Sequence, residues 1–161
     1  MGRTPQRPGY AALRRGRVSL ADHSYLVTAV TAGRRPVFRD LTAGRLVVRA
    51  LRRIEPVAPT HCYVIMPDHL HWLLHLRGAM DLASVVQRVK GWSARDIGRV
   101  TPRHRPVWQA GFHDHAVRAD TDLRGLARYI VANPLRAGLV EHIGDYPLWD
   151  AVWVEDGGAG G

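Results

Sequence analysis

The sequence predicts an α+β domain in which two helices alternate with the strands of a single antiparallel sheet. Two patterns in the 161-residue chain predict it. Short segments rich in β-branched and aromatic residues alternate with longer segments whose apolar residues recur every three or four positions. The resulting order is β-α-β-β-α-β followed by one more helix. It is the order of a ferredoxin-like split β-α-β fold with an additional C-terminal helix.

The first strand and the first helix are expected before residue 55. The first strand is predicted over Ser24–Thr31, and residues 33–36 (GRRP) break it. Asp40 is expected to cap a helix over Leu41–Arg53. The buried stripe of this helix is predicted to comprise Leu41, Val48 and Leu51.

A hairpin is expected next, because the strands Thr60–Met66 and His69–Leu76 are joined by only Pro67 and Asp68. Asp81 is then expected to cap a second helix over Leu82–Ile97. Residues 99–111 are interpreted as a loop, and Phe112–Arg118 as a fourth strand. A last helix is predicted over Asp122–Asn133, with Pro134 ending it.

The two ends of the chain differ in composition from the middle. Residues 1–17 carry five arginines among glycine and proline, Arg15 and Arg17 included. They are predicted to form a basic arm that contacts phosphates and is ordered only against a partner. Residues 155–161 form a Gly-rich tail that is expected to be flexible. We therefore expect one domain over residues 18–154.

The charge balance indicates a polyanionic partner. Arginine and lysine number 23 against 14 acidic residues, which gives a net charge of +9, and Lys90 is the single lysine. Guanidinium groups match the geometry of phosphates, so nucleic acid is the simplest partner. A coding bias toward arginine would explain the ratio of arginine to lysine but not the net charge.

Composition excludes several classes of protein. The single cysteine, Cys62, excludes internal disulfides and a multi-cysteine zinc site. No apolar run approaches the length of about 18 residues that crosses a bilayer. The N-terminus is polar and basic, unlike a secretory signal. These features favour a cytoplasmic protein with no membrane partner.

The most distinctive local pattern is MPDHLH over residues 66–71. Alternate residues of a strand share a face, so His69 and His71 are expected to point away from the core while Leu70 points into it. Two imidazoles about 6–7 Å apart at their Cα atoms can both reach one metal ion. The alternative is a half-exposed strand whose polar residues happen to be histidines. His75, about 13 Å further along, is interpreted in that way.

A second pattern combines Tyr129 with Asn133 near the end of the last predicted helix. The two residues are four positions apart, so their side chains are expected on one flank of its apolar stripe. Two histidines and one amide oxygen would leave open positions on a metal ion, and a phenol can attack a polarised phosphate. Mixed nitrogen and oxygen ligands favour Mg²⁺ or Mn²⁺. The alternative is a tyrosine at the core margin and an asparagine that serves the helix end.

Several motifs in a fixed order resemble the REP-associated tyrosine transposases, within the single-tyrosine HUH transposases. The similarity covers nearly the whole chain. The motifs are RGRVS at 15–19, RRPVF at 34–38, MPDHLHWLL at 66–74, VKGWSAR at 89–95, WQAGFHDHAVR at 108–118 and YIVANPLRAGLV at 129–140.

The resemblance implies a role for each residue of the two patterns. His69 and His71 would be the metal ligands of the HUH motif, Tyr129 the nucleophile and Asn133 the third ligand. Related enzymes often carry glutamine at that last position, and asparagine is shorter. Asp68 stands where many relatives have asparagine, and it is interpreted as a turn residue of little catalytic consequence.

Other residues in these motifs are candidates for contacts with DNA. Lys90, His115 and Arg118 are expected either to contact DNA or to order the site, with a plain surface role as the alternative. Trp108 would either stack on a base or pack in the core.

The resemblance also implies a substrate, namely single-stranded DNA with hairpins such as repetitive extragenic palindromes. Cleavage would leave a 5′-phosphotyrosine and a free 3′-hydroxyl, and another 3′-hydroxyl would resolve the link. Related enzymes act as dimers or alone, and we expect a monomer, with a dimer as the alternative. Two other hypotheses stay open: a non-catalytic binder of hairpin DNA, and a metal-dependent nuclease that activates water.

Overall fold

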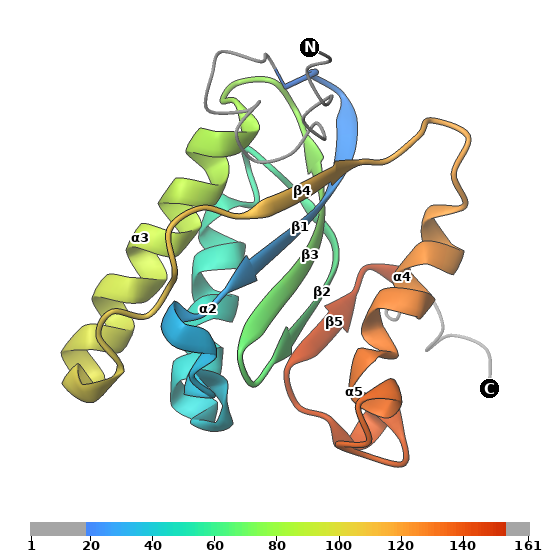
Figure 1. Ribbon diagram of the computed structural model, residues 1–161. Coiled ribbons are helices and arrows are strands. Elements are labelled where there is room, and N and C mark those ends of the chain that lie inside the picture. Colours follow the sequence, from blue (N-terminus) through green and yellow to red (C-terminus); the bar gives the residue numbers. More distant parts are fainter. Residues whose placement is uncertain (1–18, 154–161) are drawn as a thin grey trace, which may run out of the picture.

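The computed structural model describes residues 19–153, so the basic arm and the Gly-rich tail lie outside the described residues. Five strands form one antiparallel sheet in the order β4-β1-β3-β2-β5 (Figure 1). They are β1 (His23–Val30), β2 (Thr60–Met66), β3 (His69–Leu76), β4 (His113–Ala116) and β5 (Trp149–Ala151). The predicted α+β class with an antiparallel sheet is confirmed.

Helices lie on both faces of this sheet (Figure 1). The long helices α2 (Leu41–Ile54) and α3 (Leu82–Val100) cover one face, and α4 (Leu123–Val131) and α5 (Asn133–Arg136) lie on the other, beside β2 and β5. Short 3-10 turns occupy Ala32–Arg34 (η1), Val37–Arg39 (η2), Pro102–His104 (η3) and Ile143–Asp145 (η4). In the described part of the chain, no helix is long and apolar enough to cross a membrane.

The helix caps predicted from sequence are present. Asp40 accepts a hydrogen bond from the backbone N–H of Thr42 at 3.0 Å, and Asp81 accepts one from that of Ser84 at 2.7 Å. Each carboxylate satisfies a backbone donor that the first helical turn leaves without a partner. The caps therefore fix where α2 and α3 begin.

The alternation of strand β3 determines which side chains reach each face of the sheet. Trp72 and Leu74 are buried beneath α2 and α3, in the larger of two apolar clusters. Leu73 points the other way and packs with Ala127 and Ile130 of α4 in the smaller cluster. Because His69 and His71 alternate in phase with Leu73, they lie on the α4 face of the sheet.

The last predicted helix differs from the structure. We expected one helix ending at Asn133, but α4 ends at Val131, and Asn133 begins the separate helix α5. Pro134 does not end the helical region. It occupies the first turn of α5, where its missing N–H costs nothing because first-turn donors have no helical partner. Tyr129 and Asn133 therefore stand on two helices that meet at Ala132.

Two packing details also differ from the predictions. Leu41 is exposed and Val48 only half-buried, whereas the buried stripe of α2 includes Ala43, Gly44 and Val47. The small residues allow close approach, since a Cβ at Gly44 would lie 2.4 Å from a methyl of Leu148. Leu148 precedes β5, a strand that the sequence did not predict because it is only three residues long.

Candidate functional site

Two histidine side chains face each other at the start of β3. Nε2 of His69 lies 3.1 Å from Nε2 of His71, and the two rings are nearly perpendicular at 82°. Two nitrogens that are neighbouring ligands of one ion, each about 2.1 Å from it, lie about 3 Å apart. The separation of the two nitrogens therefore fits a shared metal ion.

The opposite nitrogen of each ring is held by a polar neighbour. Nδ1 of His69 lies 2.6 Å from Oδ1 of Asp68, and Nδ1 of His71 lies 3.0 Å from Oγ1 of Thr28 on β1. A carboxylate can only accept, so Asp68 fixes the proton of neutral His69 on Nδ1 and leaves the lone pair on Nε2, which faces His71. Partners of this kind orient metal-binding histidines. Asp68 is thus more than the turn residue that we interpreted it to be.

The electrostatics of the pair favour a neutral His71. Burial, followed by the electrostatic effects of His69 and Arg136, lowers the pKa of His71 to about 4. Burial alone would raise the pKa of Asp68, but hydrogen bonding to His69 and the electrostatic effects of His69 and Arg34 lower it. An uncharged imidazole is the state in which His71 can bind a cation.

Tyr129 and Asn133 lie at the junction between α4 and α5, and Arg136 contacts both of them. Tyr129 is 65% exposed, and the guanidinium carbon of Arg136 lies 4.0 Å from the centre of its ring. The same guanidinium donates to Oδ1 of Asn133 at 3.0 Å, while Nδ2 of Asn133 donates to the carbonyl of Ile130 at 2.8 Å. Arg136 is a site residue that our sequence reasoning missed. Arg136 lies three residues after Asn133, and this helical spacing is the signal in the sequence that could have identified it.

The structure brings the predicted site residues together in two groups. His69 and His71 form one, and Tyr129 and Asn133 form the other, with the electrostatic effect of Arg136 on His71 as the link between them. Among residues 19–153, no cluster of three or more histidines, cysteines or carboxylates is placed to hold a metal ion.

The remaining candidates for DNA contacts fall into different environments. Lys90 is buried and donates to the carbonyls of Gln109 and Gly111 at 2.8 and 2.7 Å, so it orders that loop. Trp108 is half-buried, donates to Ser93 at 3.0 Å and contacts the Phe38 ring. These contacts correspond to packing in the core, the alternative to stacking on a base.

His115 and Arg118 are exposed, with Arg118 3.7 Å from Asp120, whereas Arg15 and Arg17 lie outside the described residues. His75 is half-buried and lies 3.3 Å from Ser24, in a separate group with His61. It therefore does not belong to the facing pair, as the sequence predicted.

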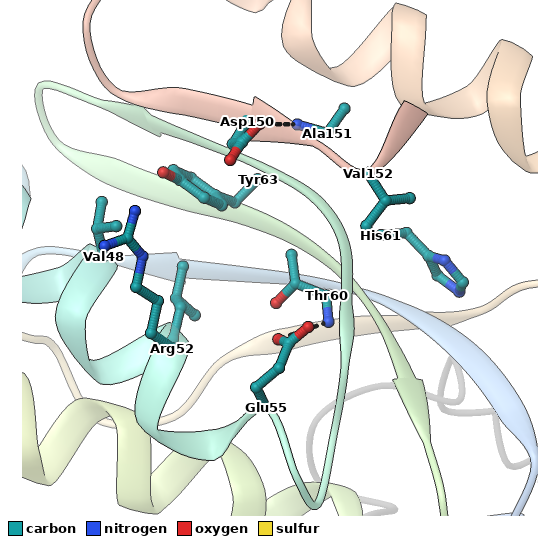
Figure 2. A pocket seen from close by; sticks show the side chains of 10 residues that line it. Val48, Arg52, Glu55, Thr60, His61, Tyr63, Asp150, Ala151 and Val152 are labelled. Atoms are coloured by element: carbon teal, nitrogen blue, oxygen red, sulfur yellow. Dashed lines mark hydrogen bonds between the residues drawn. The ribbon is translucent and has the colours of Figure 1, made fainter. Parts of the chain in front are cut away.

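A hollow of about 340 Å³ lies elsewhere, between α2 and the β2–β5 edge, where Arg52, Tyr63 and Asp150 line it (Figure 2). Burial, aided by the charge of Asp150, raises the pKa of Tyr63 to about 12. Neither the facing histidines nor Tyr129 line this hollow, so it is not part of the candidate site.

A family model described as "Transposase IS200 like" matches residues 19–133, which include the facing histidines and Tyr129. The chain therefore belongs to the IS200-like transposase family. The resemblance seen in the sequence is confirmed as well. A REP-associated tyrosine transposase of Escherichia coli (strain K12) is 30% identical over 89 residues, 55% of this chain and 51% of that protein.

A relative from Haemophilus influenzae is 31% identical over 93 residues, 52% of this chain and 53% of its own length. The chain thus spans about half the length of the curated relatives it matches. A solved structure of a REP-associated tyrosine transposase bound to a REP hairpin superposes with a TM-score of 0.71 at 22% identity. It covers 89% of this chain and 84% of that one, and the likeness shows a common fold.

Proposed function

We propose that this chain cleaves and rejoins single-stranded DNA that carries hairpins, through a covalent link between Tyr129 and a 5′-phosphate. The observation that supports it most is the pair of facing imidazoles. Tyr129 is exposed on α4, the helix that packs on the same face of the sheet. Membership of a transposase family and the REP hairpin in the similar structure support the choice of DNA substrate.

The ion that we propose is Mg²⁺ or Mn²⁺, held by Nε2 of His69 and Nε2 of His71. A bound ion would polarise the phosphate that is cut. Asn133 is the proposed third ligand, and its amide oxygen accepts a hydrogen bond from Arg136 in this structure. If that bond were released, the guanidinium would be available to a phosphate oxygen, which it can bind through two N–H groups.

Tyr129 supplies the attacking atom. Its phenol oxygen bonds to phosphorus while the bond from phosphorus to the 3′ oxygen breaks. The phenol proton passes to solvent, and the leaving 3′ oxygen takes up a proton to become a hydroxyl. The number of phosphate ester bonds is unchanged, so a second 3′-hydroxyl can reverse the step without an external energy source.

The sheet surface next to the histidine pair offers a place for a single strand. His113 on β4 pairs with Thr28 on β1, and Thr28 pairs with His71 on β3, so the three side chains share one face. His113 and His115 are exposed. Imidazoles can stack on unpaired bases, which supports single-stranded rather than fully paired DNA at this face.

Cleavage of end-labelled hairpin oligonucleotides from the gene's own flanks tests the proposal. Wild-type protein with Mn²⁺ should give cut DNA and a slow protein-linked band on a denaturing gel. Tyr129→Phe should give neither, because it removes only the hydroxyl of an exposed ring and leaves packing intact.

Tyr63→Phe is a matched control, since it removes a hydroxyl away from the histidines and should still cut. Efficient cleavage by Tyr129→Phe would assign water as the attacking group. Hairpin binding by the wild type without any cleavage would indicate a binding protein.

A further inference from the structure

The two facing imidazoles have chemically different partners on their outer nitrogens. Nδ1 of His69 lies 2.6 Å from the carboxylate of Asp68, whereas Nδ1 of His71 lies 3.0 Å from Oγ1 of Thr28. A carboxylate can only accept a hydrogen bond, while a hydroxyl has one proton to donate and two lone pairs that accept. Asp68 therefore permits one position for the ring proton of its histidine, and Thr28 permits two.

The distance between the inner nitrogens determines which position the proton of His71 takes when no metal is bound. Nε2 of His69 lies 3.1 Å from Nε2 of His71. With both rings neutral, Asp68 holds the proton of His69 on Nδ1, so Nε2 of His69 has a lone pair. Two lone pairs facing each other at this distance would repel, so Nε2 of His71 carries a proton and donates it to His69. Nδ1 of His71 then accepts a hydrogen bond from the hydroxyl of Thr28.

Binding of a cation by both Nε2 atoms requires the opposite arrangement at His71. A metal ligand must present a lone pair, so the proton on Nε2 of His71 has to leave and Nδ1 has to carry one instead. One proton passes from Nε2 to solvent and one passes from solvent to Nδ1, so the charge of the ring is unchanged. The hydrogen bond between Nδ1 and Thr28 keeps its place but reverses its direction, because the ring N–H now donates and Oγ1 accepts.

The place of Thr28 in the sheet allows this reversal without movement of the chain. Strand β1 lies between β4 and β3 (Figure 1), and Thr28 pairs with His113 on one side and His71 on the other. Its neighbours Val27 and Ala29 are buried. A β-branched side chain in a strand is also restricted at χ1, so Oγ1 stays beside Nδ1 and only the O–H bond has to turn.

We propose that Thr28 is the positioning residue of His71, and that its hydroxyl supports both tautomers of this ring and so lets the facing pair change from a hydrogen-bonded pair into a pair of metal ligands. The inference rests on the proposed function in that His69 and His71 are taken to share a divalent cation. A carboxylate in place of the hydroxyl would hold the proton on Nδ1 and set two lone pairs against each other. An apolar side chain would leave Nδ1 without this partner in either state.

Imidazole NMR of the full chain tests the tautomers directly. Long-range correlation of ring protons with ring nitrogens distinguishes the two neutral forms, at mildly alkaline pH where free imidazoles are uncharged. The signals of His71 are identified by their loss in His71→Gln. We expect a proton on Nε2 of His71 in the metal-free protein, and a proton on Nδ1 after saturation with Zn²⁺, a diamagnetic probe. A proton on Nδ1 in the metal-free protein, or the same tautomer in both states, would overturn the inference.

Two variants and a matched control test the hydroxyl. Thr28→Val keeps the β-branched shape and removes the hydroxyl, whereas Thr28→Ser keeps the hydroxyl. The control is Ser24→Ala, which removes a hydroxyl from the same strand. Oγ of Ser24 lies 3.3 Å from Nδ1 of His75, a histidine outside the facing pair, so the control breaks the same kind of bond away from the candidate site.

Isothermal titration with Mn²⁺ measures the consequence. Thr28→Val should bind Mn²⁺ about tenfold more weakly than wild type, while Thr28→Ser should stay within about threefold and Ser24→Ala within about twofold. Equal losses for the valine and serine variants would overturn the inference, and so would an unchanged affinity of Thr28→Val.

Neither measurement involves DNA or Tyr129, so an absence of cleavage leaves both results unaffected. A wild type that binds no Mn²⁺ would refute the metal site of the proposed function, and the inference with it. Mn²⁺ binding that is lost in His69→Ala but unchanged in Thr28→Val would refute only the role of Thr28. The NMR measurement on wild-type protein decides the tautomers even if Thr28→Val does not fold.

Discussion

Asp68→Asn should weaken the binding of Mn²⁺ by the histidine pair. In the wild type, Oδ1 of Asp68 lies 2.6 Å from Nδ1 of His69, which places the proton on that nitrogen and the lone pair on Nε2. Asparagine keeps an oxygen that can accept this bond but lacks the charge that strengthens it. The ring should then be less firmly oriented and a poorer electron donor.

Loss of such a partner lowers metal affinity by about 10- to 100-fold, or about 1.4 to 2.7 kcal/mol. The loss of Mn²⁺ affinity should be near the lower limit for Asp68→Asn and near the upper limit for Asp68→Ala, because alanine removes the hydrogen-bond acceptor altogether. Isothermal titration of metal-free protein with Mn²⁺ measures both values directly.

The matched control is Arg34→Gln. Arg34 is the other partner of the Asp68 carboxylate, at 3.4 Å, but its side chain is 68% exposed. An exposed ion pair contributes little, so the control should bind Mn²⁺ within about threefold of wild type. Mn²⁺ affinity of Asp68→Asn within about twofold of wild type would refute the orienting role of Asp68.

Three further predictions concern the environment of the site. Arg136→Gln should slow single-turnover cleavage at least about tenfold, because it removes the guanidinium that lies against the Tyr129 ring and that we propose for a phosphate oxygen; an unchanged rate would contradict this. Lys90→Met should lower the free energy of unfolding in urea by about 3 kcal/mol, since two carbonyls lose a charged donor; a change below about 0.5 kcal/mol would contradict it.

Metal-free protein should lose stability as the pH falls from about 6.5 to about 4, because the unfolded chain protonates His71 before the folded chain does. His71 accounts for at most about 3 kcal/mol of this decrease in the free energy of unfolding, and that contribution should be missing in His71→Gln. Denaturant unfolding at a series of pH values measures it, and identical profiles for variant and wild type would exclude the effect.

Alternation and capping made much of the fold predictable. Asp40 and Asp81 marked the starts of α2 and α3, and the period of two in HLHWLL placed His69 and His71 opposite Trp72. Strand β5 was not predictable, because three residues are too few to show a period and its pairing with β2 depends on a distant segment.

The neighbours of the site residues could not be read from spacing along the chain. Thr28 reaches His71 only through the register of β1 on β3, which is a tertiary property. The break at Ala132 was missed because Pro134 was taken to end a helix rather than to begin one, so the link between Arg136 and Asn133 was missed with it. Local patterns thus identified the reactive side chains but not the groups that orient them.

The central claim is that Tyr129 becomes covalently joined to DNA, and mass spectrometry of the trapped adduct tests it most directly. Wild-type protein incubated with hairpin oligonucleotide and Mn²⁺ would be digested with trypsin and nuclease. We predict that the peptide containing Tyr129 carries a nucleotide attached through its 5′-phosphate, and that the released strand ends in a 3′-hydroxyl. Cleaved DNA with an unmodified Tyr129 peptide, or an adduct located on another residue, would contradict the claim.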